Sequence, residues 1–66
     1  MTLEQLGVIL VALLPKDGTP RTVQWLADTA FVSRTQVNDA LLQAWNDKRV
    51  QYDLPSDSYV FRREAS

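Results

Sequence analysis

The chain has 66 residues, enough for one small domain, and its 45% hydrophobic and 23% charged content is typical of a globular protein rather than a disordered one. It has no cysteine and no histidine, which excludes disulfide bridges and the usual zinc sites but not a site built only of carboxylates; no residue is assigned to a metal or cofactor. The net charge of −1 argues mildly against strong electrostatic binding to nucleic acid, because such binding normally requires an excess of lysine and arginine on one face.

The first predicted helix begins after Thr2 and ends before Pro15. Thr2 and Gln5 form a capping-box pattern, and the turn signal Lys16-Asp17-Gly18 follows the proline. The helix is apolar nearly all round, so it needs burial on more than one side. Either the other elements of a small fold wrap it, or it forms a homodimer seam. The seam residues would be Leu6, Ile9, Leu10 and Leu13.

The same segment is the only candidate for a membrane span. Its apolar run, residues 6–14, is far shorter than the roughly 20 residues that a span requires. Glu4 precedes the run where a signal peptide would carry basic residues. We therefore expect a cytoplasmic protein, associated with the nucleoid if it binds DNA.

A second helix is predicted over residues 23–30. The preceding segment, residues 18–22, is interpreted as a connector that is extended around Pro20, and Thr22 can cap the helix. A turn at Phe31-Val32 follows. The residues expected to share one side of the helix are Trp25, Leu26 and Thr29 or Ala30.

A third helix is predicted over about residues 34–47, with Ser33 as its N-cap. We expect both Trp25 and Trp45 to be core residues rather than platforms on which bases stack, because both fall at core-facing spacing. The core positions of the third helix, at helical spacing, are Val37, Ala40, Leu41, Ala44 and Trp45.

After Lys48-Arg49 the apolar pattern changes from helical to alternating. Residues 50–53 and 58–62 therefore predict two short strands, and residues 54–57, Leu-Pro-Ser-Asp, suit a type I turn between them. The predicted fold class is mainly α with a small β-hairpin, in one domain over residues 1–63. Residues 64–66 are expected to form a frayed tail.

The pattern from residue 22 to 62 resembles the winged helix-turn-helix of MarR-like and related bacterial or phage transcription regulators. The residues that carry the resemblance are Leu26-Ala27-Asp28, Val32-Ser33-Arg34-Thr35, Val37, Ala40-Leu41 and Val50. It implies three helices and a wing, with the third helix reading the major groove.

Two positions depart from the family pattern. Phe31 stands where the turn usually has glycine, and Lys48 or Arg49 stands where glycine often precedes the wing. Glycine takes a positive φ without strain, whereas phenylalanine is not expected to, so the turn is expected to be rebuilt.

We predict sequence-specific DNA binding by a small regulator, with the third helix in the major groove and the hairpin wing, about residues 50–62, on the backbone. Asn and Gln can bond adenine, Arg can bond guanine, and Thr can touch the thymine methyl group. The alternative for these polar residues is an ordinary solvated surface. The residues expected to contact DNA are Arg21, Arg34, Thr35, Gln36, Asn38, Gln43, Lys48, Arg49, Arg62 and Arg63.

The alternative function is a winged-helix module that binds a protein rather than DNA. The near-neutral charge balance favours it, and so do three carboxylates in the third helix and the hairpin, at Asp39, Asp53 and Asp57. Leu42 and Leu54, if exposed, would dock such a partner.

The charge distribution on the folded surface is expected to separate the two functions. A continuous positive face joining Arg34, Lys48 or Arg49 and Arg62 favours DNA. A face broken by the three carboxylates favours a protein partner.

We do not expect an enzyme. The chain has no histidine or cysteine, Ser33 has a capping role, and the carboxylates are not paired for acid–base chemistry. Gly7 and Gly18 are the only glycines, so there is no glycine-rich phosphate loop. No catalytic residue is assigned.

Overall fold

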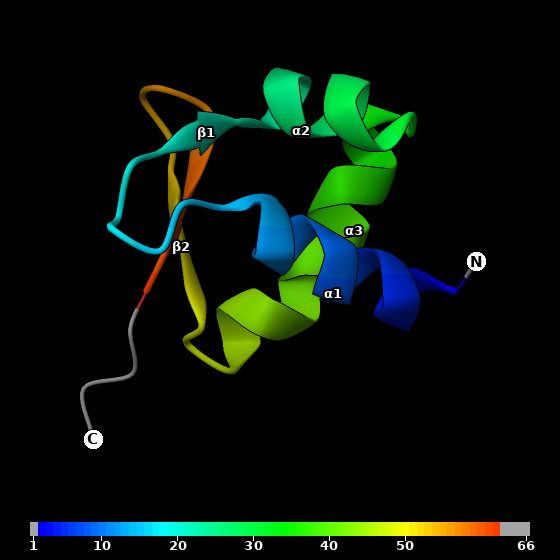
Figure 1. Ribbon diagram of the computed structural model, residues 1–66, viewed down its shortest axis with the longest axis horizontal. Helices are drawn as coiled ribbons and strands as arrows, with labels where there is room; N and C mark the ends of the chain where they lie inside the picture. Colours follow the sequence, from blue (N-terminus) through cyan, green and yellow to red (C-terminus); the bar gives the residue numbers. More distant parts are fainter. Residues whose placement is uncertain (1, 63–66) are drawn as a thin grey trace.

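The computed structural model describes residues 2–62, which form three helices beside a three-stranded antiparallel sheet (Figure 1). The elements are α1 (Leu3–Leu13), β1 (Arg21–Thr22), α2 (Val23–Ala30), α3 (Arg34–Asn46), β2 (Val50–Asp53) and β3 (Ser58–Phe61). The prediction of a mainly α fold with a small β-hairpin is confirmed, and the element order is that of a winged helix-turn-helix. We call β2, β3 and the loop 54–57 between them the wing. The predicted tail, residues 64–66, and Arg63 lie outside the described residues.

The sheet has one strand that the sequence did not predict. β1 pairs with β3, which lies between β1 and β2, so the predicted connector contributes a third strand. Two residues are too few to show an alternating pattern, and β1 exists only because β3 offers it a partner. β3 ends at Phe61, one residue earlier than predicted, and α3 likewise ends at Asn46 rather than 47.

Local side chain–backbone hydrogen bonds start each helix, as predicted. Thr2 and Gln5 form a capping box at α1, and Ser33 and Gln36 form a second one at α3. The Thr22 side chain accepts a hydrogen bond from the backbone N–H of Trp25 at 3.0 Å. These bonds satisfy N–H groups that the first turn of a helix leaves without partners.

One hydrophobic core joins all three helices to the sheet. The predicted core positions of α3 are confirmed except for Trp45. Every element except β1 contributes buried apolar residues, so the domain has a single contiguous core. The buried apolar residues are Leu6, Leu10, Leu14, Val23, Leu26, Ala27, Val37, Ala40, Leu41, Ala44, Val50 and Tyr59.

The prediction that both tryptophans are buried is wrong. Trp25 is 39% exposed and Trp45 is 50% exposed. On α2, Val23 and Ala27 fill the core beside Leu26, which turns Trp25 to the edge, where the Arg21 guanidinium lies 5.0 Å from its ring. Trp45 lies at the edge of the apolar side of α3, and so small a fold leaves part of it uncovered.

The fold itself covers much of the predicted dimer seam on α1. Leu6 and Leu10 are buried and Leu13 is partly buried, so the prediction that they form a seam between copies is wrong for the first two. Ile9, at 40% exposure, is the seam residue that remains at the surface. Within residues 2–62, no helix is both long and apolar enough to cross a membrane.

The turn between α2 and α3 contradicts the expectation for Phe31. Its backbone is left-handed, with φ 60° and ψ 44°, and its N–H donates to the carbonyl of Ala27. A left-handed residue is the usual way to close a helix C-terminus. Phenylalanine is accommodated because its side chain, 94% exposed, projects into solvent. Lys48, before the wing, is also left-handed with φ 62°.

Replacing Phe31 with glycine is expected to stabilise the protein by about 0.5–1 kcal/mol. Glycine removes the cost of the left-handed backbone, roughly 1–2 kcal/mol, but increases the backbone entropy of the unfolded chain. No buried apolar contact opposes the gain, because the side chain is exposed. Urea unfolding followed by circular dichroism measures the change. Phe31→Ala is the control, since it removes the ring but keeps the strain, and a gain in Ala equal to that in Gly would contradict this explanation.

Candidate interaction surface on α3 and the wing

The wing loop is tied to the start of α3 through Asp57. Arg34, at the N-terminus of α3, forms an ion pair and hydrogen bond with the Asp57 carboxylate. The Tyr52 hydroxyl donates to the other carboxylate oxygen at 2.5 Å, and the Asp57 carbonyl accepts from the Val23 N–H at 2.9 Å. A residue predicted to read DNA is therefore held by a carboxylate of the wing.

A second link joins the wing to α3 through Tyr59. Its hydroxyl donates to Asn38 Oδ1 at 3.0 Å, and its ring centroid lies 5.0 Å from that of Tyr52. The pKa of Tyr59 is raised mainly by burial and then by the negative charge of Asp57. The pKa of Tyr52 is raised mainly by its hydrogen bond to Asp57. Both tyrosines thus favour the neutral, hydrogen-bonding phenol in the folded protein.

Replacing Asp57 with asparagine is expected to lower the pKa of Tyr52 toward its ordinary value and to reduce stability. Asparagine tolerates the left-handed backbone of Asp57, φ 51°, so the substitution tests the charge rather than the conformation. Folding raises the pKa of Tyr52, so the hydrogen bond from its neutral phenol to Asp57 stabilises the folded protein. This stabilisation is fully present at a pH below the pKa of tyrosine in the unfolded chain, about 10. It is lost as the pH rises through the pKa of Tyr52 in the folded protein.

Phenolate absorbance during alkaline titration measures the pKa, and urea unfolding at neutral and alkaline pH measures stability. The difference in stability between wild type and Asp57→Asn should shrink at alkaline pH. Asp53→Asn, which removes another wing carboxylate that accepts from Ser56, is the control. An unchanged tyrosine titration in Asp57→Asn would exclude the proposed bond.

The other predicted base-contacting residues of α3 are also engaged within the protein, with one exception. Gln36 accepts from the Ser33 N–H at 2.9 Å in the capping box, and Gln43 donates to Asp47 at 3.2 Å. Thr35 is exposed and makes no side-chain hydrogen bond within residues 2–62. The face predicted to read bases is thus largely committed to internal bonds.

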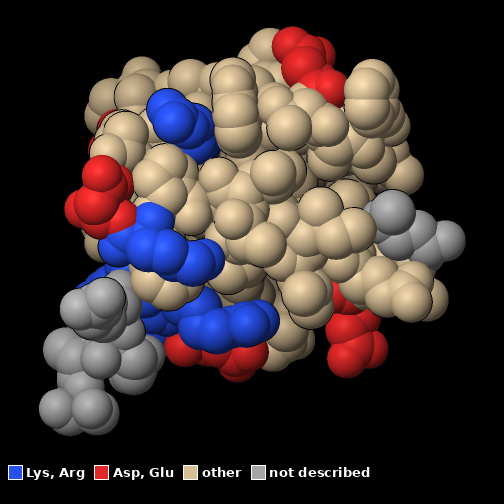
Figure 2. Space-filling view, viewed as in Figure 1, with Lys and Arg blue, Asp and Glu red and all other residues tan. Residues whose placement is uncertain are grey.

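The basic residues do not form one face with Arg34. Lys48 and Arg62 line one hollow of about 280 Å³ at the base of the wing, and Arg49 lies beside them with a 3.8 Å ion pair to Asp47. Arg34 lies at the opposite end of α3, whose 13 residues span about 20 Å. On the face in Figure 2, most blue atoms gather at the lower left, with red atoms beside and below them.

Arg21 also lies apart from the base of the wing. It belongs to β1, where its guanidinium lies over the Trp25 ring. Its Nε atom is buried without a hydrogen-bond partner within the described residues. Arg21 is therefore held against the protein surface rather than projecting as a free cation.

The exposed side of α3 carries apolar side chains rather than a row of basic ones. Leu42 is 55% exposed and Trp45 is 50% exposed, and together with Tyr52 and Tyr59 they line a groove of about 320 Å³ between α3 and the wing. Leu54, in the wing loop, is 75% exposed. Sequence reasoning named Leu42 and Leu54 but missed the groove, because it placed Trp45 in the core.

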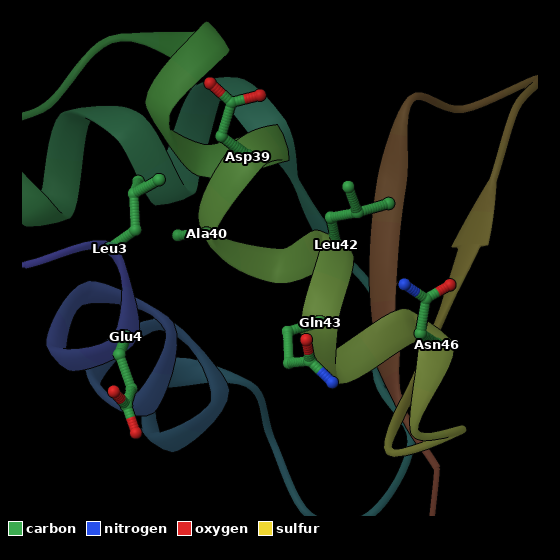
Figure 3. A pocket seen from close by; sticks show the side chains of 7 residues that line it. All are labelled: Leu3, Glu4, Asp39, Ala40, Leu42, Gln43 and Asn46. Atoms are coloured by element: carbon green, nitrogen blue, oxygen red, sulfur yellow. The ribbon is translucent and has the colours of Figure 1, made fainter.

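These exposed apolar side chains continue from Leu42 toward α1. A second hollow, of about 510 Å³, lies between the start of α1 and α3, with Leu3 53% exposed at its edge. Figure 3 shows Leu3 and Glu4 projecting from α1 and Asp39 and Leu42 from α3 around this hollow. Leu42 lines both hollows and so connects them. We call the exposed apolar residues along the two hollows the α3 strip: Leu3, Leu42 and Trp45.

Within residues 2–62, no group of three or more acidic side chains is placed to hold a metal ion. Comparison of the chain with protein-family models, with curated proteins and with solved structures found no match.

Proposed function

We propose that this chain is a winged-helix module that binds another protein through the α3 strip and the adjoining groove. The observation that carries the proposal is the half-exposed Trp45, which forms one wall of a groove whose other walls are Leu42, Tyr52 and Tyr59. Tryptophan and tyrosine are enriched where protein partners bind, and tryptophan is among the residues that contribute most to binding energy.

The chemistry of this surface fits a protein better than the major groove. From its middle to its C-terminal end, the exposed side of α3 presents Asp39, Leu42 and Trp45, none of which is basic. Base edges in the major groove are polar apart from the thymine methyl group, and a carboxylate is repelled by phosphate. Apolar side chains gain most where they are removed from water against a similar surface.

The ion pair between Arg34 and Asp57 at the wing loop also favours a protein partner over DNA. Asp57 neutralises Arg34 where a winged helix would bring the helix N-terminus to DNA. Of the three carboxylates expected to break a positive face, Asp57 pairs with Arg34, and Asp39 lines the hollow beside Leu42.

The proposal is tested with a phage-displayed library of random peptides, about 12 residues long, selected on the immobilised protein. Trp45→Ala is expected to weaken the selected peptides by about 30-fold, because truncating an interface tryptophan commonly costs about 2 kcal/mol or more. Fluorescence anisotropy with labelled peptides measures affinity. Trp25→Ala is the matched control: it removes an exposed tryptophan from α2, outside the groove, and should leave affinity unchanged.

Circular dichroism must first show that both tryptophan variants are folded. The proposal fails if no peptide is enriched above background, or if the selected peptides bind Trp45→Ala as tightly as wild type.

A second candidate function is contact with duplex DNA, as the resemblance implies. The observation in its favour is the gathering of Lys48, Arg49 and Arg62 at the base of the wing. A labelled duplex should then bind more tightly at about 25 mM than at about 150 mM salt, and Arg62→Ala should reduce the salt slope by about one unit. Arg34→Ala should also weaken binding if α3 reads the groove, and salt-independent binding would count against this function.

A further inference from the structure

The charges along the α3 strip follow an order. At the α1 end, Glu4 and Asp39 line the same hollow as Leu3 and Leu42. At the other end, Lys48 and Arg62 line a hollow that shares Trp45 with the apolar groove. The surface therefore runs from acidic through apolar to basic along one side of α3.

The two cations at the basic end are not neutralised within the described residues. Only two ion pairs occur in residues 2–62, Arg34 with Asp57 and Arg49 with Asp47. Lys48 and Arg62 take part in neither, and both are exposed. A partner carboxylate placed in this hollow can thus be attracted without displacing an ion-pair partner from residues 2–62.

The geometry points to a partner segment with the complementary order: a basic side chain, apolar anchors and then acidic side chains. This inference rests on the proposed function and specifies its partner. The apolar anchors occupy the groove formed by Leu42, Trp45 and the two tyrosines, and the acidic end faces Lys48 and Arg62. From Asp39 to its end at Asn46, α3 extends about 10 Å, and Lys48 follows two residues later, so a partner helix of about ten residues would cover this surface.

Exposed charge pairs contribute little affinity, but they determine orientation and discriminate between partners. The apolar anchors therefore provide most of the binding energy, and the charges select which end of the segment lies at the wing. The preference is expected to fall at high salt, because surface charges are screened, whereas anchoring through Trp45 persists.

The experiment uses the peptides that the wild-type protein selects and that depend on Trp45. Their sequences are expected to be enriched in Asp and Glu at one end and in Lys and Arg at the other, relative to the unselected library. The tightest peptide is then compared with a version in which acidic and basic residues are exchanged. Wild type should bind the original about tenfold more tightly at low salt, a ratio that a few favourable charge contacts account for.

Two protein variants identify the cations responsible. The double variant Lys48→Asp/Arg62→Glu should remove or reverse the preference between the two peptides, and aspartate suits the left-handed backbone of Lys48. Arg49→Glu is the matched control, because Arg49 lies at the same end of the wing but is paired with Asp47. It should change the preference much less.

The outcomes separate this inference from the proposed function. The inference is overturned if the peptides that depend on Trp45 show no charge order. It is also overturned if the double variant keeps the preference for the original peptide over the charge-exchanged one. Either result leaves the proposed function standing. Failure to select any peptide that depends on Trp45 removes both.

Discussion

The variant Leu41→Ala is expected to lose about 2–5 kcal/mol of unfolding free energy, as is typical of leucine truncation in a core. Leu41 is fully buried on α3 and belongs to the core that joins the helices to the sheet. A domain of this size has a total stability of roughly 3–10 kcal/mol, so the loss is a large share of it. If the total lies in the lower part of that range, a considerable fraction of the variant is unfolded even without denaturant.

Leu42→Ala is the control for this prediction. It makes the same chemical change at the adjacent residue of the same helix, but Leu42 is 55% exposed and borders the groove. Leu42→Ala should lose about 1 kcal/mol or less of unfolding free energy, since the truncation exposes little additional apolar area to water. Urea unfolding of both variants gives the comparison, and equal losses would mean that burial does not determine the contribution of these leucines.

Gly7→Ala is expected to destabilise the protein by about 1–2 kcal/mol, although alanine is the better helix former. A Cβ atom added at Gly7 would lie 2.8 Å from the carbonyl oxygen of Ala40, a backbone atom of α3 that cannot rotate away. Helices α1 and α3 must therefore move apart, and such overpacking costs about 1–3 kcal/mol. Helix propensity returns up to about 1 kcal/mol of this cost.

The opposite substitution on the exposed side of α1 provides the control. Ala12→Gly should lose about 1 kcal/mol, because position 12 is exposed and only helix propensity acts there. If Gly7→Ala instead raised the urea midpoint, the close approach of α1 to α3 would be relaxed in solution. Together the two variants separate the local preference of α1 from its packing against α3.

The residues that build the core are separate from those that give α3 its exposed surface. Leu26, Ala27, Val37 and Leu41 lie in the core, and Ser33 caps α3, so these residues build the architecture whichever partner is bound. The exposed residues decide what binds, because they contribute little to the core. The sequence pattern that marks the fold is therefore a weak guide to the function.

Features that depend only on neighbours in the chain could be predicted from the amino-acid sequence. A capping box needs residues only three positions apart and an N-cap only one residue, so Thr2 with Gln5, and Ser33 by itself, marked the starts of α1 and α3 correctly. Alternating apolar residues likewise identified both strands of the wing to within one residue. The core positions of α3 followed from helical spacing, apart from Trp45.

Which side chains remain at the surface could not be predicted in the same way, because it depends on how the elements pack together. Helical spacing shows that Trp45 lies beside Leu41 and Ala44, but whether it is buried depends on another element covering that side of α3, and none covers it fully. β1 required pairing with β3, and the bonds of Asp57 to Arg34 and of Tyr59 to Asn38 join residues 23 and 21 positions apart. Such contacts depend on how the helices and the wing meet in space, and they determine which charges remain available to a partner.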